Sequence, residues 1–479
     1  MLSMNHEVNM KTSSSSVCYD MIIIGAGIAG CIMAKEYAES GMNCLLLEAG
    51  KHFSKSTYPR KEIDANSQLY WSGGIELNTN ADIGILRPKA VGGGSIVNQA
   101  LLDRFDNVAL DSFKDVSNVK YFNQNDMEKY YELALAEIAL QEIPEAHRNK
   151  NAHIFIDGFK KYGYQCAPLK RAQKNCHYEE GNDCIECLAG CRIDSKQSMS
   201  ITVLPKALEA GLTLESEFEV LSIKNDKTTV RVTGRDRYGD IKTFKAGNLT
   251  MASGAIGNSK LLLNSGFSKI NKNIGKRFYT HPQFMTLAIY DEIINAQKGA
   301  FQSMKSDDPD FRVNKFKLEN VFAPPVAISM LLPGLESQHL KKMKEITHMA
   351  CIEVAVRDQN PGTIKVNSKG KVIIRKSLDA RDRASKQKGL DAIHNIFQAT
   401  GAREIIDGNF TIGLHLMGGC SIGASGRKSV INPEFKMHGT KNIFCADSSI
   451  FPDAPGINPS LTIMALSKMA SEKIIKGIK

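Results

Sequence analysis

The sequence of 479 residues predicts an α/β fold with two parts, one built on a doubly wound parallel sheet and one on an antiparallel sheet. Two observations support this prediction. A short apolar strand, a glycine-rich turn and a helix follow one another near the N-terminus, and the same succession returns at residues 248–266. In the middle of the chain, apolar and polar residues alternate, which is typical of antiparallel strands.

The segment 20–30, DMIIIGAGIAG, carries the clearest local motif. Gly25, Gly27 and Gly30 have the G-x-G-x-x-G spacing directly after the apolar strand. In a Rossmann-like unit the first glycine permits a tight turn, the second lets a pyrophosphate approach the backbone, and the third lets the helix pack on the strand. A second apolar strand ends at Glu48, where an acid can bind an adenosine ribose. This motif predicts FAD or NAD without choosing between them.

The composition excludes several classes of protein. With 42% hydrophobic and 23% charged residues, the chain has the composition of an ordinary globular protein. No nucleic acid partner is expected, because the net charge of +10 comes from scattered basic residues without interleaved aromatic residues. No apolar run approaches the ~18 residues that cross a bilayer, and the first twenty residues lack the apolar core of a signal peptide. We therefore expect a cytoplasmic protein without a transmembrane segment.

Further elements can be assigned along the chain. The segment 87–98, RPKAVGGGSIVN, is expected to be a buried loop whose backbone amides can approach a flat or phosphorylated ligand. Apolar spacing predicts helices and strands outside the nucleotide core. The expected helices are residues 126–140, 384–400 and a C-terminal helix from about Pro459, and the expected strands are residues 212–223, 228–244, 321–332, 349–356 and 371–374.

Four of the eleven cysteines form a cluster. Cys176, Cys184, Cys187 and Cys191 have the spacing C-x7-C-x2-C-x3-C, and the odd total argues against a complete disulfide framework. Clustered thiolates in a cytosolic chain favour zinc or an iron-sulfur cluster, although the spacing differs from the bacterial ferredoxin pattern. A zinc site, an iron-sulfur cluster and reduced structural thiols all remain open at this point.

Several separated motifs together resemble the glucose-methanol-choline (GMC) oxidoreductase family of FAD enzymes. The loop 91–98 resembles the first family signature, and residues 254–266 are similar to the second, with Asn258 where serine or threonine is usual. Leu416 stands where a proline often follows the histidine. The remaining matches, in family order, are residues 274–282 (IGKRFYTHP), 415–423 (HLMGGCSIG), 442–452 (NIFCADSSIFP) and 456–466 (GINPSLTIMAL). The resemblance covers nearly the whole chain.

The resemblance implies a cofactor and a domain arrangement. The cofactor would be FAD, held by a discontinuous Rossmann-like domain formed by residues 18–105, 200–283 and 405–479. Residues 106–199 and 284–404 would form the antiparallel-sheet substrate-binding domain, including the cysteine-rich segment 176–191. Gly25, Gly27 and Gly30 would hold the pyrophosphate, Glu48 the ribose, Gly93, Gly94 and Asn98 the flavin side, and Asp447 the ribityl chain. By analogy with sugar dehydrogenases of the family, Cys184, Cys187 and Cys191 would bind a three-iron cluster.

The resemblance also implies a reaction. A flavin takes a hydride from the CH-OH group of an alcohol, so the protein must supply a base and a shaped pocket. His415 is the expected base, and Asn458 is expected to hold the oxygen of a small-molecule alcohol. His281 is expected to have a structural role. The electron acceptor can be oxygen, a quinone or a redox protein. Two alternatives remain: a lyase or decarboxylase of the same fold, and an electron-transfer protein centred on a cysteine-bound iron-sulfur cluster.

Overall fold

The computed structural model describes residues 17–176 and 184–478, apart from the side chains of residues 184–186. Its first sheet has the strand order β8-β2-β1-β11-β10-β9, and β20 pairs with β11. The strands β8, β2, β1, β11 and β20 run parallel, whereas β10 and β9 extend the sheet in antiparallel fashion. The bounds are β1 (Cys18–Ile24), β2 (Cys44–Leu47), β8 (Thr213–Glu215), β9 (Glu219–Asn225), β10 (Val230–Arg235), β11 (Ile241–Met251) and β20 (Ile443–Cys445).

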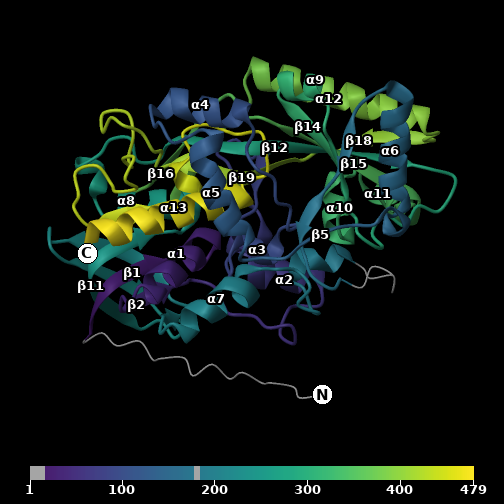
Figure 1. The fold of residues 1–479 in the computed structure, drawn as a ribbon. Coiled ribbons are helices and arrows are strands. Elements are labelled where there is room, and N and C mark those ends of the chain that lie inside the picture. The colour runs from purple at the N-terminus through teal and green to yellow at the C-terminus, as the bar shows by residue number, and fades with distance from the viewer. Residues whose placement is uncertain (1–16, 177–183, 479) are drawn as a thin grey trace.

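Helices from both ends of the chain cover this first sheet. Helix α1 (Ile28–Glu39) begins directly after the glycine turn and packs against α7 (Met199–Glu209) and α13 (Ser460–Ile478). Figure 1 shows α1 in purple and α13 in yellow side by side, although they lie at opposite ends of the sequence. The expected C-terminal helix from about Pro459 is therefore present, and it completes the layer that the N-terminal motif begins.

The second sheet is largely antiparallel, with the order β3-β4-β19-β12-β15-β14-β13-β6. Its central strand β12 pairs with β15 on one side and with β19 on the other. Its strands are β3 (Glu76–Leu77), β4 (Ile83–Ile85), β6 (Cys166–Pro168), β12 (Lys276–Ile289), β13 (Met304–Ser306), β14 (Phe316–Asn320), β15 (Met349–Val356), β16 (Gly362–Val366), β17 (Val372–Arg375), β18 (Glu404–Asp407) and β19 (Thr411–Gly419). The predicted fold class, a parallel nucleotide sheet with a second antiparallel sheet, is confirmed.

Helix α12 (Ala380–Ala399) packs on β14 and β15 of the second sheet, and α6 (Lys150–Tyr162) packs beside it on the same sheet. A capping box between Asp379 and Asp382 fixes its N-terminus. Gly389 lets the helix approach the sheet, since a Cβ there would lie 2.3 Å from a Val354 methyl carbon. The other helices are α2 (Glu62–Leu69), α3 (Gly94–Val97), α4 (Asn107–Ser117), α5 (Gln124–Leu135), α8 (Gly254–Asn264), α9 (Pro309–Val313), α10 (Pro325–Leu331) and α11 (Glu336–Met343).

Shorter elements connect these layers. A two-stranded ribbon joins β5 (Leu140–Glu142) to β7 (Lys170–Ala172). The 3-10 turns are η1 (Trp71–Gly74), η2 (Glu145–His147), η4 (Cys184–Ala189), η5 (Phe267–Lys269), η6 (Ile346–His348) and η7 (Ser448–Ile450).

The structure corrects one expected element. The run 321–332 was expected to form a strand because of its apolar residues, but it forms a loop followed by α10. Pro325 lies in the first turn of this helix, where the missing N–H costs nothing and the fixed φ suits a helix.

The expected domain limits differ from the limits of the two sheets. The limit after residue 283 falls inside β12, and β3, β4, β18 and β19 belong to the second sheet.

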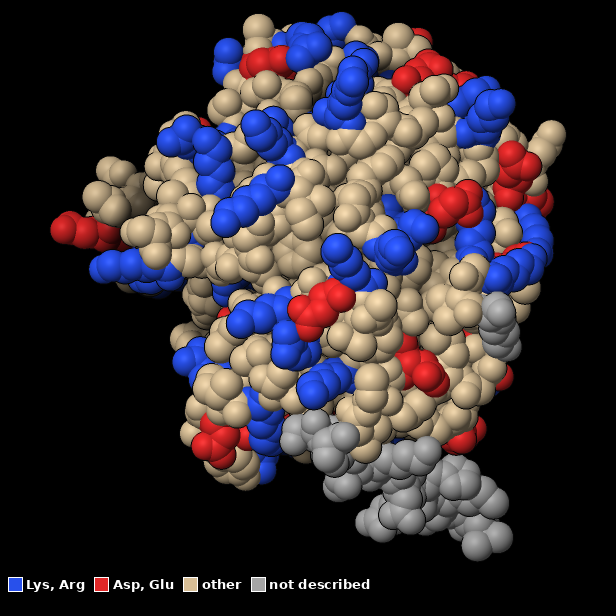
Figure 2. Space-filling view, turned by 90° about the vertical axis from the view of Figure 1, so that its left-hand side faces the viewer, with Lys and Arg blue, Asp and Glu red and all other residues tan. Residues whose placement is uncertain are grey.

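The surface carries its basic residues in a dispersed pattern. On the face in Figure 2, Lys and Arg side chains are scattered among uncharged residues and interrupted by Asp and Glu. Among the described helices, none has both the length and the apolar character needed to cross a bilayer.

Candidate active site

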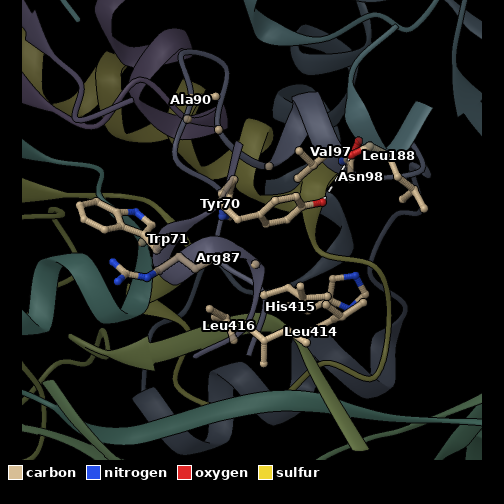
Figure 3. Close-up of a pocket in the computed structure, with 18 of the residues that line it drawn as sticks. Tyr70, Trp71, Arg87, Ala90, Val97, Asn98, Leu188, Leu414, His415 and Leu416 are labelled. Atoms are coloured by element: carbon tan, nitrogen blue, oxygen red, sulfur yellow. Dashed lines mark hydrogen bonds between the residues drawn. The ribbon is translucent and has the colours of Figure 1, made fainter. Parts of the chain in front are cut away.

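A cavity of about 1070 Å³ connects the two sheets. On one side it is lined by the glycine turn after β1 and by Glu48, and on the other by side chains from β12, β14, β15 and β19. Figure 3 shows His415 facing the same space as Tyr70 and Asn98. The volume is at the upper end of the range for ligand pockets, so the cavity has room for more than one small ligand.

The two glycine-rich loops meet at the base of this cavity. A Cβ on Gly30 would lie 1.8 Å from the carbonyl oxygen of Gly25, and a Cβ on Gly25 would lie 2.4 Å from that of Ala252. Gly93 has a φ of +53°, and a Cβ on it would lie 2.7 Å from Cα of Gly27. A Cβ on Gly27, in contrast, would meet nothing within 4 Å. The loops therefore pack backbone to backbone and leave the amides near Gly27 accessible, which suits a pyrophosphate.

Glu48 is buried at the end of β2 beside this cradle. Its Oε2 accepts a hydrogen bond from the N–H of Ala26 (2.9 Å), and its Oε1 accepts one from the N–H of Gly50 (2.7 Å). Burial raises the pKa of its carboxyl group, and these backbone donors oppose that rise. The side chain is thus held at the cavity wall, in a position that suits an adenosine ribose.

Asp447 lines the cavity at the N-terminus of α8. Its Oδ2 accepts hydrogen bonds from the N–H of Gly254 (2.7 Å) and from Nδ2 of Asn258 (2.9 Å). Nδ2 of Asn258 also lies 3.0 Å from Oγ of Ser449. Asn258, the departure from the family pattern, therefore fixes Asp447 in place.

His415 lies in β19 with a φ of +53°, a conformation that is strained for a residue other than glycine. The register between β12 and β19 shifts between Tyr279 and His281. This irregularity brings Nδ1 of His281 to 2.9 Å from Nδ1 of His415, with the two rings nearly perpendicular at 83°. His281 therefore contacts the proposed base directly.

A backbone donor determines where the protons of this pair lie. The N–H of Gly456 donates to Nε2 of His281 over 3.0 Å, so the ring proton of neutral His281 is on Nδ1 and is donated to His415. The proton of neutral His415 is then on Nε2. Burial, followed by the charge of Lys317, lowers the pKa of His415 to about 3. Burial and the neighbouring His415 also hold the pKa of His281 well below its usual range.

Asn458 lies at the start of α13 and lines the same cavity as His415. Its Oδ1 accepts a hydrogen bond from Nζ of Lys317 (3.1 Å), and its Nδ2 donates to Oε1 of Glu319 (3.4 Å). Lys317 and Glu319, both on β14, form an ion pair at 2.5 Å. The amide of Asn458 is therefore oriented by a charged pair that no sequence motif indicates.

Comparison with known families identifies the family of the chain. The N-terminal GMC oxidoreductase model matches residues 19–283, and the C-terminal model matches residues 358–467. The chain belongs to the GMC oxidoreductase family. Both matches include positions around the cavity, among them Gly25 and His415.

Relatives of this GMC protein are distant. It is 24% identical to the uncharacterised GMC-type oxidoreductase y4nJ of Sinorhizobium fredii, over 98% of this chain and 96% of the relative. It is 24% identical to long-chain-alcohol oxidase FAO4B of Arabidopsis thaliana, over 96% of this chain and 68% of the relative. The structure of formate oxidase from Aspergillus oryzae superimposes with a TM-score of 0.74 at 14% identity, over 97% of this chain and 99% of the other.

Membership of the GMC family implies FAD, and the residues at the cavity fit that cofactor. The open cradle at Gly27 and Gly94 suits the phosphates, and Glu48 suits the ribose. Asp447 and Asn98 line the same cavity. The assignment of each residue to one part of FAD stays a prediction.

The cysteine-rich segment of this GMC protein reaches the cavity wall. The thiols of Cys187 and Cys191 interact, and that hydrogen bond and burial raise the pKa of Cys191. The side chain of Cys184 lies outside the described residues. Within the described part of the chain, no group of three potential ligands is placed to hold a metal ion. An iron-sulfur cluster or zinc therefore stays a prediction.

One buried lysine connects this segment to the glycine-rich loop 91–98. Nζ of Lys196 donates to the carbonyl oxygens of Ile96 (2.5 Å), Asn98 (3.0 Å) and Cys187 (2.5 Å). In Figure 3 the hydroxyl of Tyr70 also donates to the carbonyl oxygen of Leu188, over 3.4 Å. The cysteine-rich segment thus forms part of the cavity wall. Sequence motifs indicated neither of these contacts.

Proposed function

We propose that this GMC protein oxidises the CH-OH group of an alcohol to a carbonyl group, with FAD as cofactor. The observation that carries the proposal is that His415, in contact with His281, lines the same cavity as Asn458 and the glycine cradle. A relative named as a long-chain-alcohol oxidase supports it. FAD supplies the hydride acceptor, so this chain has to bind the hydroxyl group and take its proton.

Asn458 is proposed to orient the alcohol oxygen. Lys317 and Glu319 hold its amide group in one orientation, because Oδ1 accepts from the lysine and one N–H of Nδ2 donates to the glutamate. The second N–H of Nδ2 is then available to donate to the oxygen of the substrate. Held in this way, the oxygen needs no further reorientation before the proton leaves.

His415 is proposed to take the hydroxyl proton on Nε2. In the tautomer selected by Gly456, that atom already carries a proton and can only donate. Proton acceptance therefore requires the other tautomer, in which His281 is protonated on Nε2 and no longer accepts from the Gly456 N–H. Since Gly456 lies two residues before Asn458, we expect this peptide to shift when substrate binds.

The first test is the substitution His415→Ala in the FAD-loaded protein. The rate at which an alcohol bleaches the flavin absorbance, measured without oxygen, should fall by about 10²- to 10⁴-fold, the range for loss of a general base. The FAD content should stay unchanged. The control is His153→Ala, because His153 is exposed on α6 and does not line the cavity.

Alcohol oxidation at the wild-type rate by the alanine variant would contradict the assignment of His415. Flavin that no alcohol bleaches, even in the wild-type protein, would instead favour a lyase or decarboxylase of the same fold.

A further inference from the structure

The wall of the cavity formed by the second sheet contains polar side chains that the proposed reaction does not use. Glu319 on β14 lies directly opposite Glu353 on the neighbouring antiparallel strand β15. The two residues are 2% and 4% exposed, and both line the cavity. Two carboxyl groups opposite each other would repel each other if both were charged, so this pair needs a compensating contact.

Amide groups complete this polar cluster. Nε2 of Gln302 donates to Oε2 of Glu319 over 2.6 Å, and Nε2 of Gln283 donates to Oε1 of Glu353 over 3.3 Å. Gln283 is only 3% exposed, yet its Oε1 has no hydrogen-bond partner among the described residues. A buried acceptor without a partner on a cavity wall indicates that a ligand supplies the missing donor.

The protonation of the pair limits what that ligand can be. Burial, and then the charge of Glu319, raises the pKa of Glu353 well above its usual range, and the two carboxyl groups share a hydrogen bond. Glu319 forms its ion pair with Lys317. The proton between Glu319 and Glu353 is therefore used within the pair, and Oε1 of Gln283 is the acceptor that the cluster leaves for a ligand.

A hydroxyl group matches this arrangement, because it can donate to Oε1 of Gln283. A cationic group would be repelled by Lys317, and an anionic group would meet two carboxyl groups. A simple hydrocarbon chain would leave Oε1 of Gln283 without a partner. Apolar side chains around the cluster can pack against the carbon skeleton, among them Met285, Phe301, Val321 and Cys351.

We propose that Gln283, held in place by Glu353 and Glu319, binds a second hydroxyl group of the substrate, so that the enzyme acts on diols, polyols or sugars in preference to simple aliphatic alcohols. This inference rests on the proposed oxidation of alcohols and adds the substrate class. The first hydroxyl group would be at Asn458. The second hydroxyl group would be at Gln283. Glu319 contacts both Asn458 and the carboxyl group of Glu353, so Glu319 connects the two hydroxyl sites.

The test compares 1-hexanol with its 1,2-, 1,3- and 1,4-diols and with a hexitol in the FAD-loaded protein. The rate of flavin bleaching without oxygen yields kcat/KM for each alcohol, and the ratio of diol to monool cancels differences in the active fraction. The wild-type protein should prefer at least one hydroxylated substrate by about 10-fold or more. In Gln283→Leu and in Glu353→Leu, that preference should fall by about 10- to 100-fold.

Two further variants make the result specific. Glu353→Gln keeps a neutral donor and acceptor, so it should retain much more of the preference than Glu353→Leu. Thr286→Val is the control for changes on β12, because Thr286 bonds to Asp407 and does not line the cavity. It should leave the preference unchanged.

A ratio near one for every substrate in the wild-type protein would overturn the proposed hydroxyl site, and so would a ratio unchanged in both leucine variants. In either case the oxidation of alcohols itself would stand. Flavin that none of these alcohols bleaches would overturn the proposed function, which separates the two failures.

Discussion

At the scale of single residues, one backbone hydrogen bond determines which ring nitrogen of His415 carries the proton. His281 accepts from the Gly456 N–H and therefore donates to His415, which leaves the proton of neutral His415 on Nε2. The strained φ of His415 is part of this arrangement, because it re-aims the side chain within an otherwise extended strand. The contact therefore depends on backbone irregularities in both β12 and β19.

The burial of His415 should make stability depend on pH. Its pKa is lowered from 6.5 to about 3 in the folded protein, so the unfolded chain binds more protons between these values. The free energy of unfolding should therefore fall as the pH decreases below about 6.5, at about 1.4 kcal/mol per pH unit for this residue. Denaturant unfolding at pH 7, 6 and 5 measures it. Asparagine does not titrate, so in His415→Asn the free energy of unfolding should depend less steeply on pH. Equal pH dependence in both proteins would contradict the lowered pKa of His415.

At the scale of elements, the short helix α3, which lies within the glycine-rich loop 91–98, contacts the cysteine-rich segment. Four residues cannot form a stable helix alone, so its position depends on tertiary contacts. Lys196 donates to the carbonyl oxygen of Ile96 within α3 and to that of Asn98 at its C-terminal cap, and it also donates to the carbonyl oxygen of Cys187. Because Asn98 lines the cavity, the lysine positions part of the cavity wall.

Lys196→Met should therefore weaken both stability and FAD binding. The three carbonyl groups would lose a charged donor, which should lower the free energy of unfolding by about 2–3 kcal/mol. The dissociation constant for FAD should rise by about 10-fold or more, since 1.4 kcal/mol corresponds to a factor of ten. Denaturant unfolding and fluorescence titration with FAD measure the two effects. Lys174→Met, at an exposed position close in sequence, is the control, and equal FAD affinity in the two variants would argue against this role of Lys196.

At the scale of the whole molecule, the cavity depends on both sheets. Its lining includes Gly25 from the first sheet and Glu353 from the second, and α8 contacts both β9 and β19. A ligand in this cavity therefore stabilises the two parts together. Trp71, the single tryptophan of the sequence, also lines the cavity, with the guanidinium of Arg87 4.5 Å from its ring centre.

Removal of FAD should lower the Tm of the whole protein by several degrees, because FAD at 100 times its Kd contributes about 2.7 kcal/mol to the folded state. Calorimetry of the protein with and without FAD measures this effect. Titration of FAD into the cofactor-free protein should also change the fluorescence of Trp71. If the fluorescence of Trp71 did not change on addition of FAD, the cofactor would bind away from this cavity.

Sequence motifs located the glycine loops, Glu48, His415 and Asn458, because each of these residues lies in a contiguous segment whose spacing has a local physical meaning. They could not locate the contact between His281 and His415, which depends on a register shift between β12 and β19. The opposition of Glu319 and Glu353 likewise depends on the register of β14 and β15. Cross-strand register arises from the whole sheet, so no single segment reveals it.

The packing of α13 on α1 sets an order of events during synthesis. The ribosome makes α1 long before α13, and Asp447 and β20 also come late in the sequence. Until these residues have left the ribosome, the nascent protein lacks one wall of its cavity and one strand of its first sheet. We therefore expect the cavity to hold FAD only once α13 has emerged and packed on α1.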